Sequence, residues 1–195
     1  MNIGLTGGIG CGKSTALACF REAGCATLDT DALVRDLLAH DAPLIGAVAA
    51  AFGEAVLDQE GKVDRAALSR TVFGNSEALS TLESLVHPRV REIWTGELRK
   101  GHPVLIIEIP LLFEKDLAGH FTRTLCLSCD PEVQRERLTA RGMTEEAMHQ
   151  RQRRQFSLEE KRSRADIILH NNGTPEHLRE QVLWVLERLG CPTRS

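Results

Sequence analysis

The segment formed by residues 7–14 constrains this chain more than any other part of its sequence. It contains Gly-Gly-Ile-Gly-Cys-Gly-Lys-Ser and fits the pattern G-x-x-x-x-G-K-[ST] in full. Glycines permit backbone angles that turn successive N–H groups inward, which makes a nest for phosphate oxygens. The pattern predicts that Lys13 reaches the β- and γ-phosphates of a nucleotide and that the Ser14 hydroxyl binds Mg²⁺. A glycine-rich turn without a ligand is the alternative interpretation.

Predicted strands and helices alternate around this loop. Residues 2–6 form a short predicted strand before it, and residues 13–23 form a predicted helix after it. Further strands are predicted at 26–28, 104–109, 122–127 and 165–169, and further helices at 131–140 and 174–189. This order is typical of the α/β class. It predicts a three-layer P-loop NTPase fold, in which a parallel five-stranded sheet carries helices on both faces.

The long stretch from residue 32 to residue 100 has an almost wholly helical pattern, which is too long for a plain crossover between two strands. It therefore predicts an inserted helical subdomain. Breaks between its helices are expected at Pro43, Gly53, Gly61, Gly74 and Pro88. The expected organisation is one domain, 1–195, with its core at about 1–31, 101–136 and 164–195, the insertion at about 32–100, and a helical lid at about 137–163.

Composition excludes several classes of protein. The chain has 195 residues, of which 42% are apolar and 26% charged, as expected for a single globular domain. A net charge of −3 argues against nucleic acid or an anionic membrane as the main partner. No apolar run approaches the roughly 20 residues of a membrane helix, and the first residues do not resemble a signal peptide. We expect a cytoplasmic protein, and a monomer is favoured.

The six cysteines are scattered along a chain without an export signal, so reduced thiols are expected. Cys126 and Cys129 form a C-x-x-C pair. A redox or zinc role for this pair is the weaker interpretation, because Cys126 lies in a strand-like run and no second pair has metal-ligand spacing. Two small core residues are the favoured interpretation.

Carboxylates follow two of the predicted strands. Asp29 and Asp31 are two residues apart, so their side chains project to the same side if the extended geometry persists. One of them is a candidate for holding a Mg²⁺-bound water or for accepting the proton of a hydroxyl group. For Asp31 the alternative is a helix N-cap. Glu108 ends an apolar run at a Walker-B-like position, where it is a second candidate for the Mg²⁺-bound water.

Basic residues gather in the segment 135–164, which has nine Arg and Lys against five Glu, while the rest of the chain sums to −7. This asymmetry favours a bound polyanion, because the remainder of the chain is acidic. Arg137 and Arg141 are four apart on a predicted helix, where they can clamp transferring phosphates. A solvated helical face with Glu–Arg pairs is the alternative.

These features resemble one family, the dephospho-coenzyme A kinases, over nearly the whole chain. The opening through Thr15 resembles the family's phosphate loop, and Leu28-Asp29-Thr30-Asp31 resembles its Asp-Ala-Asp segment, with Thr30 replacing the usual Ala. The matching segments further along the chain are Arg65-Ala66-Ala67-Leu68, Val72-Phe73, Leu85-Val86-His87-Pro88, Pro110-Leu111-Leu112-Phe113-Glu114, Arg137-Leu138 with Arg141, Ala165-Asp166-Ile167-Ile168 and Asn171-Asn172-Gly173.

The resemblance implies ATP-dependent phosphorylation of the ribose 3′-hydroxyl of dephospho-coenzyme A, with Mg²⁺. It implies that Asp31 is the catalytic base and that Lys13 and Arg137 stabilise the phosphoryl group. His87 and Leu111 would contact the acceptor, although His87 is equally well explained as a helix cap and Leu111 as core. Mg²⁺ would be held by Ser14, with Asp29 or Glu108 acting through water. The nucleotide would be bound by Gly8, Gly10, Cys11, Gly12, Lys13, Ser14, Thr15, Arg141 and Asn172.

Two departures from the family pattern and two alternative functions remain. The family usually has Ser in place of Cys11, and the lid turn after Arg141 is one residue shorter, which leaves the placement of Arg141 open. One alternative is a P-loop kinase of another small acceptor, such as a nucleotide or a shikimate-like molecule. The other is a nucleotide-dependent switch without phosphoryl transfer, which Asp31 and the helical insertion argue against.

Overall fold

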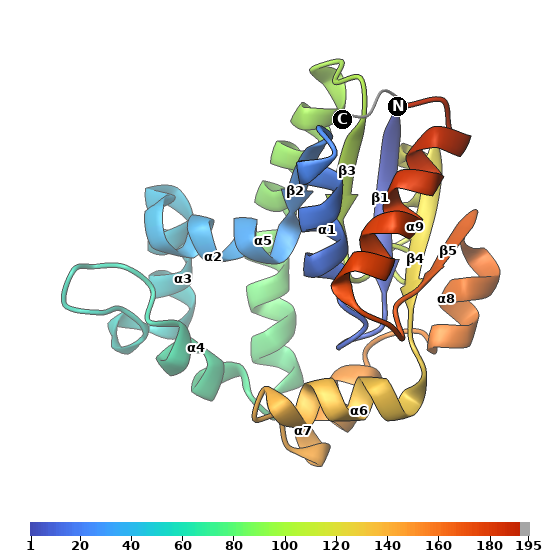
Figure 1. Cartoon of the computed structure of the whole chain (residues 1–195). Coiled ribbons are helices and arrows are strands. Elements are labelled where there is room, and N and C mark those ends of the chain that lie inside the picture. The colour runs from blue at the N-terminus through green and yellow to red at the C-terminus, as the bar shows by residue number, and fades with distance from the viewer. Residues whose placement is uncertain (192–195) are drawn as a thin grey trace. The chain divides into compact units, whose positions relative to one another are not determined.

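The strands form one parallel sheet, as predicted. The computed structural model describes residues 1–191. Its strands are β1 (Asn2–Gly7), β2 (Ala26–Asp29), β3 (Leu105–Glu108), β4 (Arg123–Ser128) and β5 (Ile167–His170). They make a five-stranded sheet in the order β2-β3-β1-β4-β5, and every pairing is parallel (Figure 1). The strand that leads into the glycine-rich loop is therefore central.

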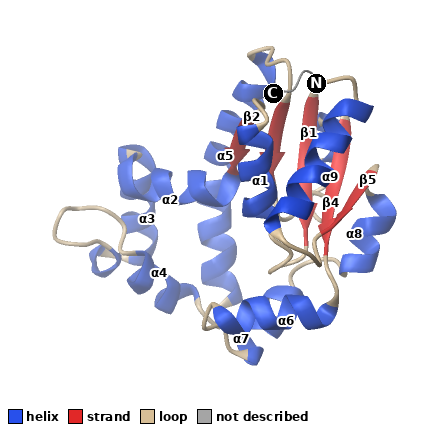
Figure 2. Cartoon of the chain, viewed as in Figure 1, coloured by secondary structure: helices blue, strands red, loops and turns tan. Residues whose placement is uncertain are grey.

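α-Helices connect the strands everywhere except between β3 and β4, and they make up most of the remaining regular structure (Figure 2). They are α1 (Lys13–Glu22), α2 (Thr30–His40), α3 (Ala42–Phe52), α4 (Arg65–Val72), α5 (Ser76–Arg99), α6 (Pro131–Ala140), α7 (Glu145–Gln152), α8 (Leu158–Arg164) and α9 (Pro175–Arg188). Short 3₁₀ turns occur at Glu54–Val56 and Ala118–His120. No helix within residues 1–191 is both long enough and apolar enough to cross a membrane.

Helices cover both faces of the sheet. On one face, Ile3 and Leu5 of β1 pack in a fully buried cluster with side chains of α1 and α9. The other face is covered in part by α8, which contacts β1 and β4. Because side chains alternate along a strand, Gly4 and Thr6 lie on that second face. The three-layer α/β arrangement is therefore confirmed.

The chain divides into two compact units. One comprises residues 1–29 together with the chain from Gly101 onward, and the other comprises Thr30–Lys100. The first unit contains the sheet. The second unit is helical, and its α5 packs against α2, α3 and α4. Its buried side chains include Leu44, Val48, Val86, Val90 and Trp94.

Several local predictions at the start of the second unit and within it are wrong. Pro88 does not break the helical pattern, because α5 runs without interruption from Ser76 to Arg99 with the proline inside it. His87 accordingly lies within that helix and does not cap one. The extended geometry after β2 also does not persist, since α2 begins at Thr30. Asp31 therefore belongs to the first turn of α2 and is not its N-cap.

Candidate active site

The glycine-rich loop leaves β1 at Gly7 and enters α1 at Lys13. Gly7, Gly10 and Gly12 have φ angles of 146°, 77° and 89°, which residues other than glycine rarely adopt. Neighbouring groups also leave no room for a Cβ at two of these positions. A Cβ at Gly7 would collide with the carbonyl oxygen of Leu127, and one at Gly12 would collide with the side-chain amide of Asn171. The loop shape therefore requires glycine for both conformational and packing reasons.

The first turn of α1 offers hydrogen-bond donors to an anion. Gly12 occupies the N-cap position and makes no side-chain capping bond to the helix. The N–H groups of the first turn, together with the positive end of the helix dipole, are therefore suited to phosphate oxygens. Ser14 and Thr15 are exposed in this turn, whereas Gly8, Gly10 and Cys11 are buried.

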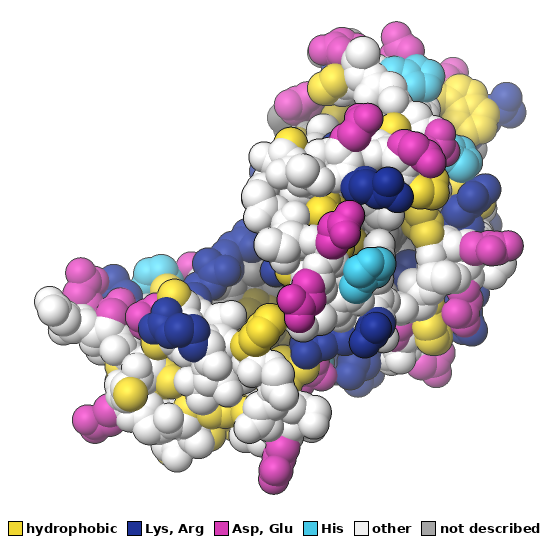
Figure 3. Space-filling model, turned by 90° about the horizontal axis from the view of Figure 1, so that it is seen from below, with side chains coloured by type: hydrophobic (Ala, Val, Ile, Leu, Met, Phe, Trp, Pro, Cys, Tyr) yellow, Lys and Arg dark blue, Asp and Glu magenta, His cyan; other side chains and the backbone are white. Residues whose placement is uncertain are grey.

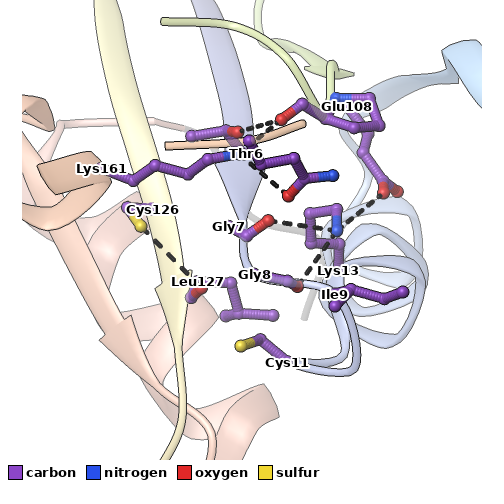
Figure 4. Close-up of polar contacts among 12 residues, drawn as sticks. Thr6, Gly7, Gly8, Ile9, Cys11, Lys13, Glu108, Cys126, Leu127 and Lys161 are labelled. Carbon is purple, nitrogen blue, oxygen red and sulfur yellow. Dashed lines mark hydrogen bonds and ion pairs between the residues drawn. The ribbon is translucent and has the colours of Figure 1, made fainter. Parts of the chain in front are cut away.

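Lys13 is held by its own loop (Figure 4). Its Nζ donates to the carbonyl oxygens of Gly7 at 3.3 Å and Gly8 at 3.2 Å. It also lies 4.0 Å from Oε1 of Glu108, and the two side chains are only 12% and 5% exposed. A cation and a carboxylate so weakly hydrated attract each other more strongly than a surface pair. These three contacts hold the Lys13 side chain at the loop.

The acidic residues at the strand ends are neighbours in the sheet. The register pairs Glu108 of β3 with Leu5 of β1 on one side and with Asp29 of β2 on the other. Glu108 is 4% exposed and Asp29 is half-buried. Both side chains therefore belong to the sheet edge at which the loop begins. Asp31 is an exposed residue of the helical unit.

The arginines expected in a lid have different surroundings. Arg137 is half-buried, and its Nη1 donates to the carbonyl oxygen of Asn171 at 2.8 Å. Arg141 is exposed and forms the C-cap of α6. The helix ends there in a Schellman motif, because Gly142, with a φ of 73°, donates to Thr139 and Met143 donates to Leu138. The short turn after Arg141 is thus a regular helix end.

The resemblance implies that the loop Asn171-Asn172-Gly173 lies near the nucleotide, and Asn172 is the residue assigned there to nucleotide binding. Asn171 is buried, and its Nδ2 donates to the carbonyl oxygen of Cys11 at 2.9 Å. Asn172 is exposed, and its Oδ1 accepts from the N–H of Asp130 at 2.8 Å. Asn171 therefore supports the loop directly, while Asn172 ties the segment after β5 to the segment after β4.

Gln134 is a second support of the loop that the sequence did not reveal. Its Nε2 donates to the carbonyl oxygen of Ile9 at 2.6 Å. The residue lies on α6, one turn before Arg137. No motif includes it, and only its position in the fold identifies it.

A buried lysine on α8 is a further unpredicted residue. Lys161 is fully buried, and its Nζ donates to the Pro110 carbonyl at 2.7 Å and lies 3.0 Å from Oε1 of Glu114. Burial lowers the pKa of Lys161, against the opposing effect of the Glu114 carboxylate. The Pro110 carbonyl also accepts from Oγ1 of Thr6 at 3.2 Å. Lys161 of α8 and Thr6 of β1 therefore donate to the same carbonyl oxygen, and Figure 4 shows both side chains.

The segment after β3 is mostly core. Leu112 and Phe113 are buried, which agrees with core packing, and Leu111 is half-buried. Glu114 accepts from the N–H of Phe156 at 2.8 Å in addition to its contact with Lys161. This segment therefore fixes the chain on both sides of Ser157, the residue at which α8 is capped.

In the helical unit, His87 lines a hollow of about 490 Å³ on the surface of α5. His87 and Pro88 are both exposed there. The other lining residues are Ser80, Glu83, Ser84 and Arg91, so the hollow combines hydroxyl, carboxylate and guanidinium groups.

Charge on the face at which the strands end is mixed, since Lys and Arg side chains lie among Asp and Glu side chains (Figure 3). Some basic residues of the segment 135–164 are paired within the protein. Arg164 lies 2.7 Å from Glu160 and stacks over the Phe156 ring at 4.6 Å. For Arg164, the alternative of a solvated helical face with Glu–Arg pairs therefore holds. Within residues 1–191, no group of three or more His, Cys, Asp and Glu is arranged to hold a metal ion.

Comparison with known proteins shows which family the chain resembles over most of its length. A family model described as dephospho-CoA kinase matches residues 1–176. A dephospho-CoA kinase from Geobacillus kaustophilus is 39% identical over 96% of each chain. Among solved structures, a protein from Thermus thermophilus is 41% identical with a TM-score of 0.81 over 97% of each chain. A dephospho-CoA kinase from Campylobacter jejuni is 25% identical with a TM-score of 0.64 over 96% of each chain.

Proposed function

This chain belongs to the dephospho-coenzyme A kinase family, and we propose that it phosphorylates the ribose 3′-hydroxyl of dephospho-coenzyme A with ATP. The products are coenzyme A and ADP, so the reaction is the last step of coenzyme A synthesis. The loop with three positive-φ glycines and an inward-held Lys13 is the observation that carries this proposal. A shikimate kinase from Aquifex aeolicus shares the fold at 18% identity, which supports the fold alone.

The nucleotide phosphates are proposed to bind at the loop. The backbone N–H groups of Gly8, Gly10, Gly12 and the first turn of α1 face phosphate oxygens, and the side chain of Cys11 stays buried behind them. Lys13 is proposed to leave the two loop carbonyls and to contact the β- and γ-phosphates, where it stabilises the charge that develops during transfer. The exposed hydroxyl of Thr15 lies in the same turn and is assigned to the α-phosphate.

Arg137 and Arg141 are proposed to act on the phosphates from α6. Arg137 contributes charge to the transferring phosphoryl group, and its bond to the Asn171 carbonyl positions it. Arg141 and Asn172 are assigned to the rest of the nucleotide. Because Lys161 of α8 is fully buried against the sheet, a lid that ends before α8 agrees better with the packing than one reaching residue 163.

The acceptor is proposed to bind the helical unit Thr30–Lys100. Asp31 accepts the proton of the 3′-hydroxyl while the hydroxyl oxygen attacks the γ-phosphorus and the bond to ADP breaks. His87, in the hollow on α5, and the half-buried Leu111 are assigned to contacts with the acceptor.

A divalent cation fits the loop. The exposed Ser14 hydroxyl is a hard oxygen ligand, and Asp29 and Glu108 are adjacent carboxylates from which one can bind through water. Mg²⁺, when bound, neutralises charge on the β- and γ-phosphates. We propose that the enzyme acts as a cytoplasmic monomer, with neither nucleic acid nor membrane as a partner.

The test is ADP release from Mg-ATP with and without dephospho-coenzyme A, with mass spectrometry of the product. One added phosphate on the acceptor is expected, and Lys13→Ala should abolish it. Asp31→Asn should lower turnover by about a hundredfold while ATP binding is retained. Asp36→Asn is the matched control, because Asp36 lies on the same helix and its side chain is 69% exposed. ADP release that ignores the acceptor would contradict the proposal.

A further inference from the structure

Two cysteine sulfurs meet beneath the phosphate loop. The Cys129 thiol donates to Sγ of Cys11 across 3.1 Å. Cys11 is 0% exposed and Cys129 is 4% exposed. Cys11 belongs to the loop itself, whereas Cys129 directly follows β4 and is 118 residues away in sequence. The phosphoryl transfer proposed above uses neither sulfur.

The two thiols have unequal acidity. The pKa of Cys11 is lowered by the hydrogen bond from Cys129 and by the Lys13 cation, although burial opposes this. The pKa of Cys129 is raised by the same hydrogen bond and by burial. Cys11 is therefore the better nucleophile of the two, and Cys129 is the proton donor beside it.

We propose that Cys11 and Cys129 form a reversible disulfide that anchors the phosphate loop to the end of β4. The oxidant is a small peroxide such as hydrogen peroxide. The Cys11 thiolate attacks one peroxide oxygen, which gives a sulfenic acid and, after proton uptake, water. The Cys129 sulfur then attacks the Cys11 sulfur, and a second water leaves with the Cys129 proton. Two thiols and one peroxide thus give one disulfide and two waters.

The bond requires the two sulfur atoms to approach each other. A disulfide has a sulfur–sulfur distance of about 2.05 Å, so the 3.1 Å pair must close by roughly 1 Å. The backbone around Cys11 is tightly held, because its N–H donates to the Gly8 carbonyl and its own carbonyl accepts from Asn171. Closing the pair therefore strains this hydrogen-bonded loop.

The consequence for activity rests on the proposed role of the loop in binding ATP. Displacement of phosphate-binding N–H groups by about 1 Å is expected to lower kcat/KM for ATP by about a hundredfold. Formation of the bond itself does not depend on that role.

The other described thiols are poor competitors. Burial raises the pKa of Cys126 to about 11, and its Sγ contacts only the Leu127 carbonyl, at 3.8 Å, among the hydrogen bonds that the structure gives it. Burial likewise raises the pKa of Cys25 to about 11 and raises the pKa values of Cys19 and of the half-buried Cys191. Thiols that stay protonated react slowly with peroxide, so oxidation is expected to select Cys11, whose pKa is lowered and whose sulfur lies 3.1 Å from that of Cys129.

The experiment treats the reduced full-length protein with graded hydrogen peroxide, blocks remaining thiols with N-ethylmaleimide and maps non-reduced tryptic peptides by mass spectrometry. A link between peptides 1–13 and 124–135 is expected. Peptide 124–135 also contains Cys126, so the map is repeated with Cys126→Ser, in which the link should persist. Kinase activity should fall as the link forms, and dithiothreitol should restore both.

Cys129→Ser is the decisive variant, because it keeps the loop sequence intact. It should retain the activity of the reduced protein and resist loss of activity at peroxide concentrations that inactivate the wild type and Cys126→Ser. Absence of the link, or a link through Cys126, would overturn the proposal. If the Cys11–Cys129 disulfide forms completely while ATP binding and turnover stay unchanged, the proposed effect of the disulfide on the phosphate loop is overturned. If the reduced protein shows no kinase activity, the proposed function fails while the peptide map still decides whether the disulfide forms.

Discussion

Replacing the buried lysine of α8 should destabilise the protein more than removing any exposed charge. Lys161 is 0% exposed and donates to Pro110 and Gln155 while it neutralises Glu114, whose side chain is 10% exposed. In Lys161→Met the carboxylate of Glu114 keeps the Phe156 N–H but loses its cation. A buried pair broken on one side costs about 3–5 kcal/mol. With a urea slope of about 2 kcal/mol/M, the midpoint should fall by about 2 M.

A double variant separates lost charge from lost packing. Glu114→Gln removes the negative charge and keeps a side-chain oxygen that can accept from the Phe156 N–H. In Lys161→Met with Glu114→Gln no buried charge is left unpaired, so we expect the double variant to be more stable than Lys161→Met alone. The measurement is urea unfolding followed by circular dichroism for wild type, both single variants and the double variant.

Lys100→Met is the matched control. Lys100 lies 2.6 Å from Glu97, but its side chain is 60% exposed. An exposed pair contributes less than about 1 kcal/mol, so its midpoint should barely move. A cost below about 1 kcal/mol for Lys161→Met, or additive costs in the double variant, would refute a coupled buried pair.

Three further predictions concern the loop, α6 and the last strand. Gly12→Ala should lower the free energy of unfolding by at least about 1–2 kcal/mol because of its φ of 89° alone, and it should weaken ATP binding measured by calorimetry. Gly46→Ala is the control, because Gly46 lies in α3 with open space around it, and this variant should be as stable as the wild type or more stable. Arg137→Met should lower turnover by about a hundredfold or more, while Arg135→Met, exposed on the same helix, should not; equal losses would contradict the role of Arg137. Burial opposes a low pKa for Asp166, but hydrogen bonds from the Thr124 side chain and N–H lower it. The ionised Asp166 carboxylate should thus stabilise the fold at pH values above its pKa in the unfolded chain, and this stabilisation should be lost as pH falls through its lower pKa in the folded protein. The difference in melting temperature between wild type and Asp166→Asn should therefore narrow in acid.

The order of strands and helices was predictable because each element carries a local signal. The apolar run at 104–109 predicted a strand, and β3 occupies residues 105–108, all of which are buried. The helix at Pro131–Ala140 was predicted to the residue, because a proline in the first turn follows Asp130. Local rules failed where packing outweighs propensity. Pro88 stays inside α5, whose buried Val86 and Val90 flank it and hold the helix in place.

The motif residues of the site were predictable, and their supports were not. A pattern of glycines with Lys13 and Ser14 has a fixed spacing along the chain. Gln134, Asn171 and Lys161 act through contacts that span 125, 160 and 51 residues. No local spacing records such a contact. A lysine within the charged sequence Glu-Glu-Lys-Arg is expected at the surface, whereas the fold buries Lys161 completely.

The shape of the phosphate loop is therefore a property of the whole first unit as much as of the motif. The carbonyl of Leu127 on β4 and the amide of Asn171 after β5 occupy the space that side chains at Gly7 and Gly12 would need. Gln134 and Asn171 bind the carbonyls of Ile9 and Cys11, so those carbonyls point away from the space that the N–H groups line. Because a peptide carbonyl and the following N–H point in opposite directions, fixing the carbonyls orients the donors. Gln134 and Asn171 thus hold the loop in the shape that is proposed to bind phosphate.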